Sequence, residues 1–197
     1  MPDLLVIAIA ALALVLFWAV GAYNRLVRLR AAIGTAFAAL DARYAERLAW
    51  IGDMLKQGQQ PTVVDPGAGA PEPPPTLPSW ARLRAASEQW ALALAAVRAQ
   101  PGDGDAVGRL VLAHSALQAA WTGIPVQDWA SRVAIDATPA LVQWERLRHQ
   151  EQPLALAFNA AVHRYNAAAR QFPAALMARL CGFHAAQTLP LLEEEAP

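Results

Sequence analysis

The sequence has a single cysteine, no excess of charge of either sign and few aromatic residues. Because Cys181 has no second cysteine to pair with, an internal disulfide is excluded, which fits a reducing compartment without establishing one. The 16 basic residues are balanced by 16 acidic ones, so the chain lacks the net positive charge that non-specific nucleic-acid binding requires. We therefore expect no nucleic-acid partner.

Sustained alternation of apolar and polar residues, the pattern of a half-buried strand, is also lacking. Hydrophobic residues make up 56% of the 197-residue chain and aromatic residues only 8%. Alanine carries much of this excess, and it is the residue that loses least on becoming helical. These features predict an all-α protein with one soluble domain of ordinary size beside a membrane segment.

The run from Leu4 to Ala22 contains no charged or strongly polar residue. As a helix it would span roughly 28 Å at ~1.5 Å per residue, about the thickness of a bilayer core. No Lys or Arg precedes it, whereas aromatic and basic residues follow at its end: Trp18, Tyr23, Arg25, Arg28 and Arg30. The apolar run therefore predicts a transmembrane anchor over residues 1–22. The positive-inside rule predicts its orientation, with the N-terminus outside and the C-terminal part in the cytoplasm.

A cleaved signal peptide is the main alternative to this anchor. Ala19 and Gly21 could imitate a small-x-small cleavage site, but a basic start is absent and the apolar run is long for a signal peptide. Cleavage, or an inverted anchor, would make the chain an exported periplasmic helical binding protein.

Residues 23–56 are predicted to form the first helix of the soluble part, because apolar residues recur at steps of three and four. The stripe consists of Leu26, Leu29, Ile33, Phe37, Leu40, Tyr44, Leu48, Ile51 and Leu55. No proline lies between the anchor and this stripe, so we expect one continuous helix. Residues 57–79 are rich in proline and glycine and predict a linker with polyproline character, or a ligand site for a proline-recognising domain.

Residues 80–185 are predicted to hold the remaining helices. The second helix should start after Ser79 as its N-cap and end at Pro101, and PGDG at 101–104 should be a turn. The third should stop near Gly123 and Pro125. The apolar faces of these two helices are Leu83, Trp90, Leu94 and Val97, and then Val107, Leu110, Val111, His114, Leu117 and Trp121.

A short helical piece is expected around Trp129, and Thr138 with Pro139 should open the last long helix. Pro153 should kink or divide it. Its apolar positions are Leu141, Trp144, Leu147, Phe158, Val162, Tyr165, Ala169 and Phe172. The predicted fold is thus an N-terminal single transmembrane helix continuing into an antiparallel bundle of about four long helices, followed by an acidic tail over residues 186–197.

Three segments, in two regions of the chain, resemble a known family. YNRLVRLR at 23–30 and AFAALDARYAERLAWIGDML at 36–55 follow the anchor, and FNAAVHRYNAAARQFPAALMARLCGF stands at 158–183. Together they resemble the LemA family of bacterial membrane proteins, as a divergent member in which Phe158 stands where the family usually has tyrosine. The resemblance implies a single span in the bacterial inner membrane, an all-α cytoplasmic domain and no established enzymatic activity. It also suggests company with membrane-bound zinc metallopeptidases.

Residues for a catalytic or metal site do not converge in the sequence. The histidines are His114, His149, His163 and His184, and no two of them have the i, i+4 spacing that places two zinc ligands on one helical face. Cys181 and His184 could share a face, but two ligands make no closed site. His114 lies within an apolar stripe and is interpreted as a core residue. We expect no catalytic, cofactor-binding or metal-binding residues.

Asparagines beside the apolar seam are the more informative polar residues. Asn159 and Asn166 are expected to fix the register of packed helices through hydrogen bonds, or else to belong to a binding face. The packing or interaction positions are Tyr23, Asn24, Arg28, Asn159, Tyr165, Asn166, Phe172 and Pro173. The sequence predicts a non-enzymatic membrane-anchored scaffold that binds the bilayer and another membrane protein such as a zinc metallopeptidase. A metal-dependent hydrolase is the alternative.

Overall fold

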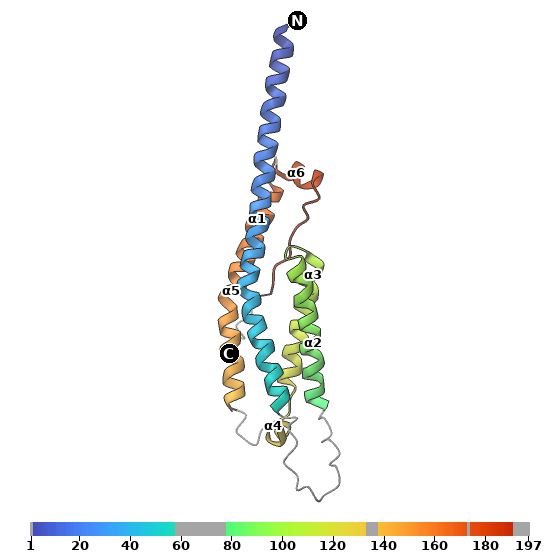
Figure 1. The fold of residues 1–197 in the computed structure, drawn as a ribbon, viewed down its shortest axis with the longest axis vertical. Coiled ribbons are helices and arrows are strands. Elements are labelled where there is room, and N and C mark those ends of the chain that lie inside the picture. The colour runs from blue at the N-terminus through green and yellow to red at the C-terminus, as the bar shows by residue number, and fades with distance from the viewer. Residues whose placement is uncertain (1, 58–77, 133–137, 173, 191–197) are drawn as a thin grey trace, which may run out of the picture.

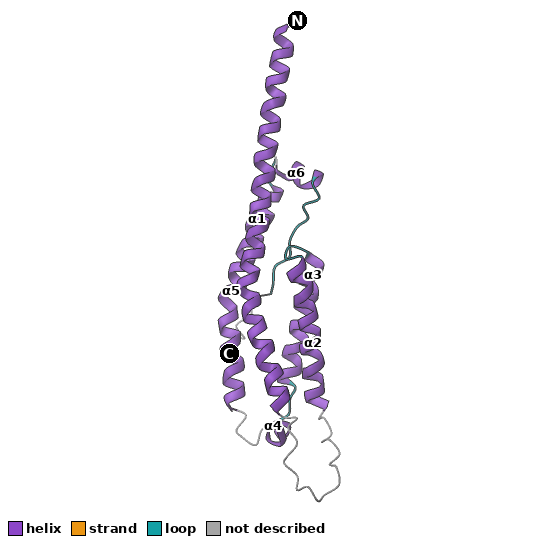
Figure 2. Ribbon diagram, viewed as in Figure 1, coloured by secondary structure: helices purple, strands orange, loops and turns teal. Residues whose placement is uncertain are grey.

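The computed structural model describes residues 2–57, 78–132, 138–172 and 174–190, and this part of the chain is all-α (Figures 1 and 2). The predicted helical class is therefore confirmed. The helices are α1 (Pro2–Gln57), α2 (Pro78–Ala99), α3 (Gly104–Thr122), α4 (Val126–Arg132), α5 (Thr138–Arg170) and α6 (Ala174–Leu180). Most of the predicted linker at 57–79 lies outside the described residues, but its ends, Gln57, Pro78 and Ser79, are helical.

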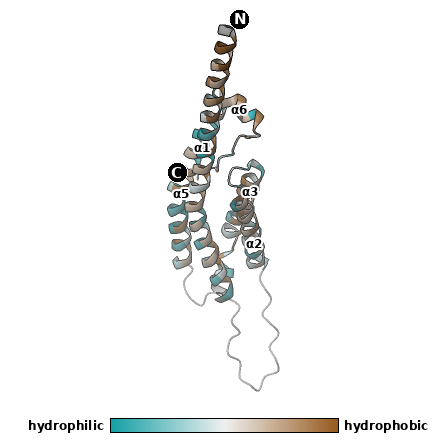
Figure 3. Ribbon diagram, turned by 45° about the horizontal axis from the view of Figure 1, so that its top comes forward, coloured by the Kyte–Doolittle hydropathy of each residue, from teal (hydrophilic) through white to brown (hydrophobic). Residues whose placement is uncertain are grey.

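The first helix has two parts with different surroundings. Its N-terminal part extends beyond the other helices and is apolar around its whole circumference (Figures 1 and 3). Its most apolar stretch has no buried residue and is long enough to cross a membrane by length and composition. From Leu26 onward α1 has buried residues, and α1 as a whole packs along α5 and also touches α2 and α6. The expectation of one continuous helix through both parts is confirmed.

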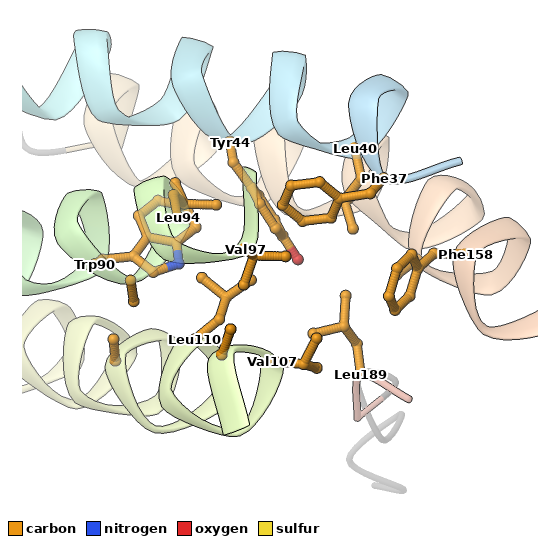
Figure 4. Packing of buried hydrophobic residues seen from close by; sticks show 14 of the residues in the cluster. Phe37, Leu40, Tyr44, Trp90, Leu94, Val97, Val107, Leu110, Phe158 and Leu189 are labelled. Atoms are coloured by element: carbon orange, nitrogen blue, oxygen red, sulfur yellow. The ribbon is translucent and has the colours of Figure 1, made fainter. Parts of the chain in front are cut away.

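The core forms where the predicted stripes meet. In Figure 4, Phe37, Leu40 and Tyr44 of α1 face side chains of α2, α3 and α5. Most stripe residues are buried, and Leu29, Leu48 and Val111 are partly buried against the same core. At the end far from the N-terminus, α4 brings Trp129 against Trp80 and Trp121. Trp121 in turn stacks on Trp144 with centroids 4.3 Å apart. This aromatic cluster fastens α2, α3, α4 and α5 together.

Helix ends follow local sequence in most places. Asp103 caps α3 by accepting a hydrogen bond from the Asp105 backbone N–H, so the PGDG turn is confirmed. At the end of α6, Gly182 adopts a φ of +69°, and the Phe183 N–H donates to the Ala178 carbonyl at 2.8 Å. A residue without Cβ suits this left-handed cap, which turns the chain back along the domain.

Several predicted boundaries are wrong. Ser79 is not an N-cap, because α2 already includes Pro78, and the Ser79 hydroxyl donates instead to Asp128. Pro153 lies inside α5, so the predicted division of this helix is wrong, while the predicted kink stays a prediction. The Pro153 ring lies on the exposed face, where water can serve the carbonyl that loses its N–H partner. Leu141 is 47% exposed, and Phe172 lies beyond the end of α5 with 87% of its surface exposed.

The predicted acidic tail also begins too early. Residues 184–190 form a non-helical segment that leaves α6 and returns to the helical domain (Figure 2). Ala186 and Leu189 of this segment are buried, and Leu189 lies in the core near Val107 and Phe158 (Figure 4). Glu193, Glu194 and Glu195, on which the prediction of an acidic tail rested, lie outside the described residues.

Candidate functional site

A buried ionic cluster lies between α1, α3 and α5. The guanidinium of Arg47 is fully buried and forms an ion pair from Nη2 to Oε2 of Glu151, which is 4% exposed. Its Nη1 lies 3.3 Å from Nε2 of His114. Because arginine can only donate, His114 accepts at Nε2, which assigns its proton to Nδ1. The cluster therefore contains a charged pair and a neutral imidazole.

Aromatic rings enclose the Arg47 guanidinium. Its Cζ lies 5.3 Å from the ring centroid of Trp90 and 4.7 Å from that of Trp144. Both distances suit attraction between a cation and the faces of aromatic rings. Trp90 also stacks on His114, and Tyr44 meets both rings edge-on. Four helices thus contribute to the surroundings of one cation.

Burial changes the protonation of this cluster. It lowers the pKa of His114 from 6.5 to about 4, and the nearby positive charge of Arg47 acts in the same direction. Burial raises the pKa of Glu151 from 4.5 to about 7, although the Arg47 charge opposes that rise. The pKa of Tyr44 is also raised, first by burial. Burial lowers the pKa of Arg47, but arginine keeps its proton in proteins.

Several polar atoms of the cluster are left without a partner within the described part of the chain. Oε1 of Glu151, Nε of Arg47 and Nε1 of Trp90 are buried without a hydrogen-bond partner among the described residues. The cavities described below are not lined by Arg47, His114 or Glu151. Within the described ranges, no group of three or more His, Cys, Asp or Glu side chains could hold a metal ion. The arrangement can join helices and respond to pH.

A second polar site holds the segment after α6 against α5. The side-chain amide of Asn159 donates to the Leu189 carbonyl at 2.7 Å and accepts from the Leu189 N–H at 2.8 Å. Asn166 makes the same pair of bonds with Ala186, at 2.8 and 3.0 Å. The Tyr165 hydroxyl donates to the His184 carbonyl at 2.9 Å. We call Asn159, Tyr165 and Asn166 the α5 clamp.

The spacing of the α5 clamp explains why it fits an extended chain. Asn159 and Asn166 are two helical turns apart, which is ~10.5 Å along the helix axis. Ala186 and Leu189 are three residues apart, which is about 10 Å in an extended segment. The two amides therefore meet the backbone of every third residue, and the segment runs antiparallel to α5. The predicted role of these asparagines between packed helices is wrong, because they bind a non-helical segment.

The other predicted interaction positions lie elsewhere. Tyr23 packs edge-on against Phe183 with centroids 5.7 Å apart, while Asn24 and Arg28 are exposed on α1. Phe172 lies 6.3 Å from the ring of Trp18. Pro173 falls outside the described residues. The seven described positions thus do not form one site, and among them the α5 clamp brings three together.

A groove of about 730 Å³ lies where the N-terminal part of α1, which extends beyond the other helices, meets the packed part. Tyr23 and Arg30 line it from α1, Gln100 and Pro101 from the turn after α2, and Phe183 from the segment after α6. The Arg30 guanidinium lies 5.9 Å from the Phe183 ring centroid. The lining of the groove includes the positive charge of Arg30 and the thiol of Cys181, with no carboxylate or histidine among its residues.

Arg47 and Glu151 were not identified from the sequence, although their positions carry a signal. Arg47 is three residues after Tyr44 and four before Ile51, so it falls on the apolar stripe of its helix. Glu151 stands four residues after Leu147 and seven before Phe158. A charge on each of two stripes predicts a buried pair.

Comparisons with protein-family models, with curated proteins and with solved structures found no match for this chain.

Proposed function

We propose that this chain is a membrane-anchored helical interaction protein without catalytic activity, and a divergent member of the LemA family. The observation that carries the proposal is the two-part α1. Its first part exposes large apolar side chains in succession, for example Leu5 at 65%, Leu14 at 70% and Phe17 at 83%. Each such side chain gains about 1.5–3 kcal/mol when it leaves water. A bilayer would supply that gain to all of them together.

The orientation follows from the residues at the end of the apolar part. Arg25, Arg28 and Arg30 come directly after it, whereas the apolar stretch itself holds no Lys or Arg. These arginines are exposed, so they are free to meet anionic headgroups. In the proposed topology the N-terminus is outside and α1 enters the cytoplasm, where it forms an antiparallel bundle with α2, α3 and α5.

An interaction role suits the polar sites better than catalysis does. The buried cluster joins helices, and the α5 clamp already binds a backbone segment with paired amides. The proposed partner is another membrane protein, for which a zinc metallopeptidase is the expectation that comes with the family resemblance. A metal-dependent hydrolase is the rival, and stoichiometric zinc or iron in the purified full-length protein would support it.

The single cysteine provides a direct test of topology. Cys181 is exposed and is the only cysteine in the chain. In spheroplasts, a membrane-impermeant maleimide should leave Cys181 unlabelled, whereas inverted vesicles should label it. A matched control is Asp3→Cys combined with Cys181→Ser, which should show the opposite pattern. Labelling of Cys181 from outside would place the helical domain in the periplasm and refute the proposed orientation.

The partner is tested in the same membranes. Photo-crosslinking from an exposed residue of the helical domain, such as Leu112 at 70% exposure, should yield a discrete heterologous adduct. The matched control is the same crosslinker at Leu5, within the proposed span. Adducts that only mirror the abundance of bulk membrane proteins would contradict an interaction role.

A further inference from the structure

The α5 clamp recognises a backbone and not a particular side chain. Asn159 and Asn166 each use one amide to bind both the N–H and the carbonyl of a single residue of the extended segment. Any residue except proline offers the same pair of groups at those two positions. The hydrogen bonds of the clamp can therefore form equally with an extended segment of this chain or of another protein.

Side-chain selection comes from the surroundings of two positions. Ala186 and Leu189 are each 7% exposed, and Leu189 enters the core beside Val107 and Phe158 (Figure 4). Between them, Gln187 passes over α3, where its Oε1 would lie 3.4 Å from a Cβ added at Gly108. The site thus holds a small residue, alanine, in buried surroundings at the first position and leucine three positions later.

An unfilled cavity lies beside the bound segment. It measures about 310 Å³ and is lined by Asn166, Arg170, Arg179 and Ala185, among others. Ala185 is the residue just before the small position, and its methyl group leaves this space open. Arg170 and Arg179 stand in its wall with no acidic side chain among the lining residues. A glutamate in place of Ala185 would extend into the cavity toward two positive charges.

We propose that the α5 clamp is a binding site for an extended peptide segment of another protein, with an acidic residue, then a small residue, and leucine three positions after the small one. Residues 184–189 of this chain are the resident competitor that occupies the site in the absence of that partner. This inference rests on the proposed interaction function and names the chemistry of the partner.

A segment of another protein fits this site better than the tail of a second copy. A second copy would bring the same Ala185 and the same contacts, so it gains nothing over the segment already tethered beside the site. Tethering gives the resident segment an effective concentration on the order of millimolar. Only a segment with additional contacts can displace it at lower concentration, and the cavity between Arg170 and Arg179 offers such contacts to an acidic side chain.

The test uses the full chain in lipid nanodiscs and two fluorescent peptides of residues 182–190, one unchanged and one with Ala185→Glu. A chain variant with Ala186→Asp and Leu189→Asp loosens the resident segment and leaves the clamp intact. This variant should bind both peptides, the Ala185→Glu peptide about fivefold more tightly. Wild-type chain should bind each peptide at least about tenfold more weakly, because its own segment competes.

Matched variants separate the parts of the site. In the loosened chain, Asn159→Leu with Asn166→Leu should abolish binding of both peptides. Arg170→Gln with Arg179→Gln should remove only the advantage of the Ala185→Glu peptide. A third peptide with Ala185→Gln should bind like the unchanged one, because it fills the cavity without charge.

Specific outcomes would overturn the proposal. One is a loosened chain that keeps wild-type helicity by circular dichroism and binds neither peptide, and another is binding that survives loss of both asparagines. Concentration-dependent dimerisation of wild-type chains through exchanged tails would assign the site to a second copy. If the loosened chain does not fold, hydrogen exchange of the wild-type chain decides. Residues 184–190 should then exchange well before α5, and exchange only together with α5 would refute a displaceable segment.

Peptide binding and membrane topology can fail separately. A chain that binds the peptides but labels at Cys181 from outside would refute the proposed orientation and keep the peptide site. A correctly oriented chain that binds no peptide would refute the peptide site and keep the proposed orientation.

Discussion

Arg47 of α1 and Glu151 of α5 form an ion pair across the interior of the protein, with exposures of 0% and 4%. The pair joins the two longest helices at a level where Trp90 and Trp144 also enclose the guanidinium. The two side chains of the pair differ in whether they can become neutral when they are buried. Glu151, with a pKa raised to about 7, can take up a proton, whereas arginine cannot lose one.

This difference predicts unequal effects of two similar substitutions. At pH 8, where Glu151 is mainly ionised, Glu151→Met should destabilise the protein by about 3–5 kcal/mol, because it leaves the Arg47 charge buried and unpaired. Arg47→Met should cost less, about 1–2 kcal/mol, because Glu151 then becomes neutral and only the cation–aromatic contacts and hydrogen bonds are lost. Guanidinium unfolding followed by tryptophan fluorescence measures both.

The double variant and an exposed pair complete this experiment. Arg47→Met with Glu151→Met should recover most of the stability lost in Glu151→Met alone, since no charge remains buried. The control is Arg98→Met, which breaks the bond to Asp41 at the surface, where Arg98 is 47% exposed, and should cost less than about 1 kcal/mol. Equal losses of stability in the two buried single variants would contradict the conclusion that Glu151 can become neutral while Arg47 stays charged.

His114 should remain neutral to unusually low pH. Burial lowers its pKa from 6.5 to about 4, so its ring should gain a proton only near pH 4 in the folded protein. The unfolded chain takes up this proton at higher pH, so the stability that depends on neutral His114 is complete above pH 6.5 and is lost as the pH falls toward 4. Nitrogen-15 NMR of the imidazole reports the titration directly, and protonation near pH 6.5 would contradict the buried setting.

Glu151 gives the opposite dependence on pH. Its pKa is raised from 4.5 to about 7, so the stability linked to its protonated form is complete below pH 4.5 and is lost as the pH rises toward 7. From pH 4.5 to 6.5 the two contributions oppose each other. His114→Phe removes only the contribution of the histidine. Between pH 6.5 and pH 4.5, the stability of this variant relative to wild type should therefore rise by about 2 kcal/mol. A difference that does not change with pH would show that His114 does not titrate as described.

The α5 clamp predicts a specific effect of a small change. Asn159→Asp keeps an acceptor for the Leu189 N–H but removes the donor to the Leu189 carbonyl, and it buries a carboxylate at a position only 7% exposed. Hydrogen exchange of residues 184–190 should accelerate at least about tenfold, since an unsatisfied buried group costs on the order of 1–3 kcal/mol. Exchange in α2 and α3 should not change. His163→Asp, an exposed change on the same helix, is the matched control and should leave the segment protected.

The helices could be predicted from the sequence because their signals are local. The stripe from Leu26 to Leu55, the cap at Asp103 and the start at Thr138 each depend on residues within a few positions. That α5 continues through Pro153 could not be predicted in this way. It depends on Pro153 lying on the solvent-exposed face of α5, and the packing of the other helices decides which face is exposed. The position of Ser79 inside α2 depended in the same way on a contact with Asp128, far away in the chain.

The sites were harder to predict because they join distant segments. The sequence drew attention to Asn159, Tyr165 and Asn166, but their ligand is a segment without a secondary-structure pattern of its own. His114 is half-buried and stacks on Trp90, while its partner Arg47, which is fully buried, was hidden within an apolar stripe. Pairing of two charged stripe positions required knowing that α1 packs along α5.

The proposed function requires that the apolar N-terminal part of α1 stays in a lipid bilayer. Alkaline carbonate extraction of membranes, followed by mass measurement of the intact chain, tests it most directly. We predict that the chain stays in the membrane pellet with residues 1–22 attached, and that Leu12→Arg combined with Leu16→Arg shifts it toward the supernatant. A soluble chain that begins beyond Gly21 would contradict the claim.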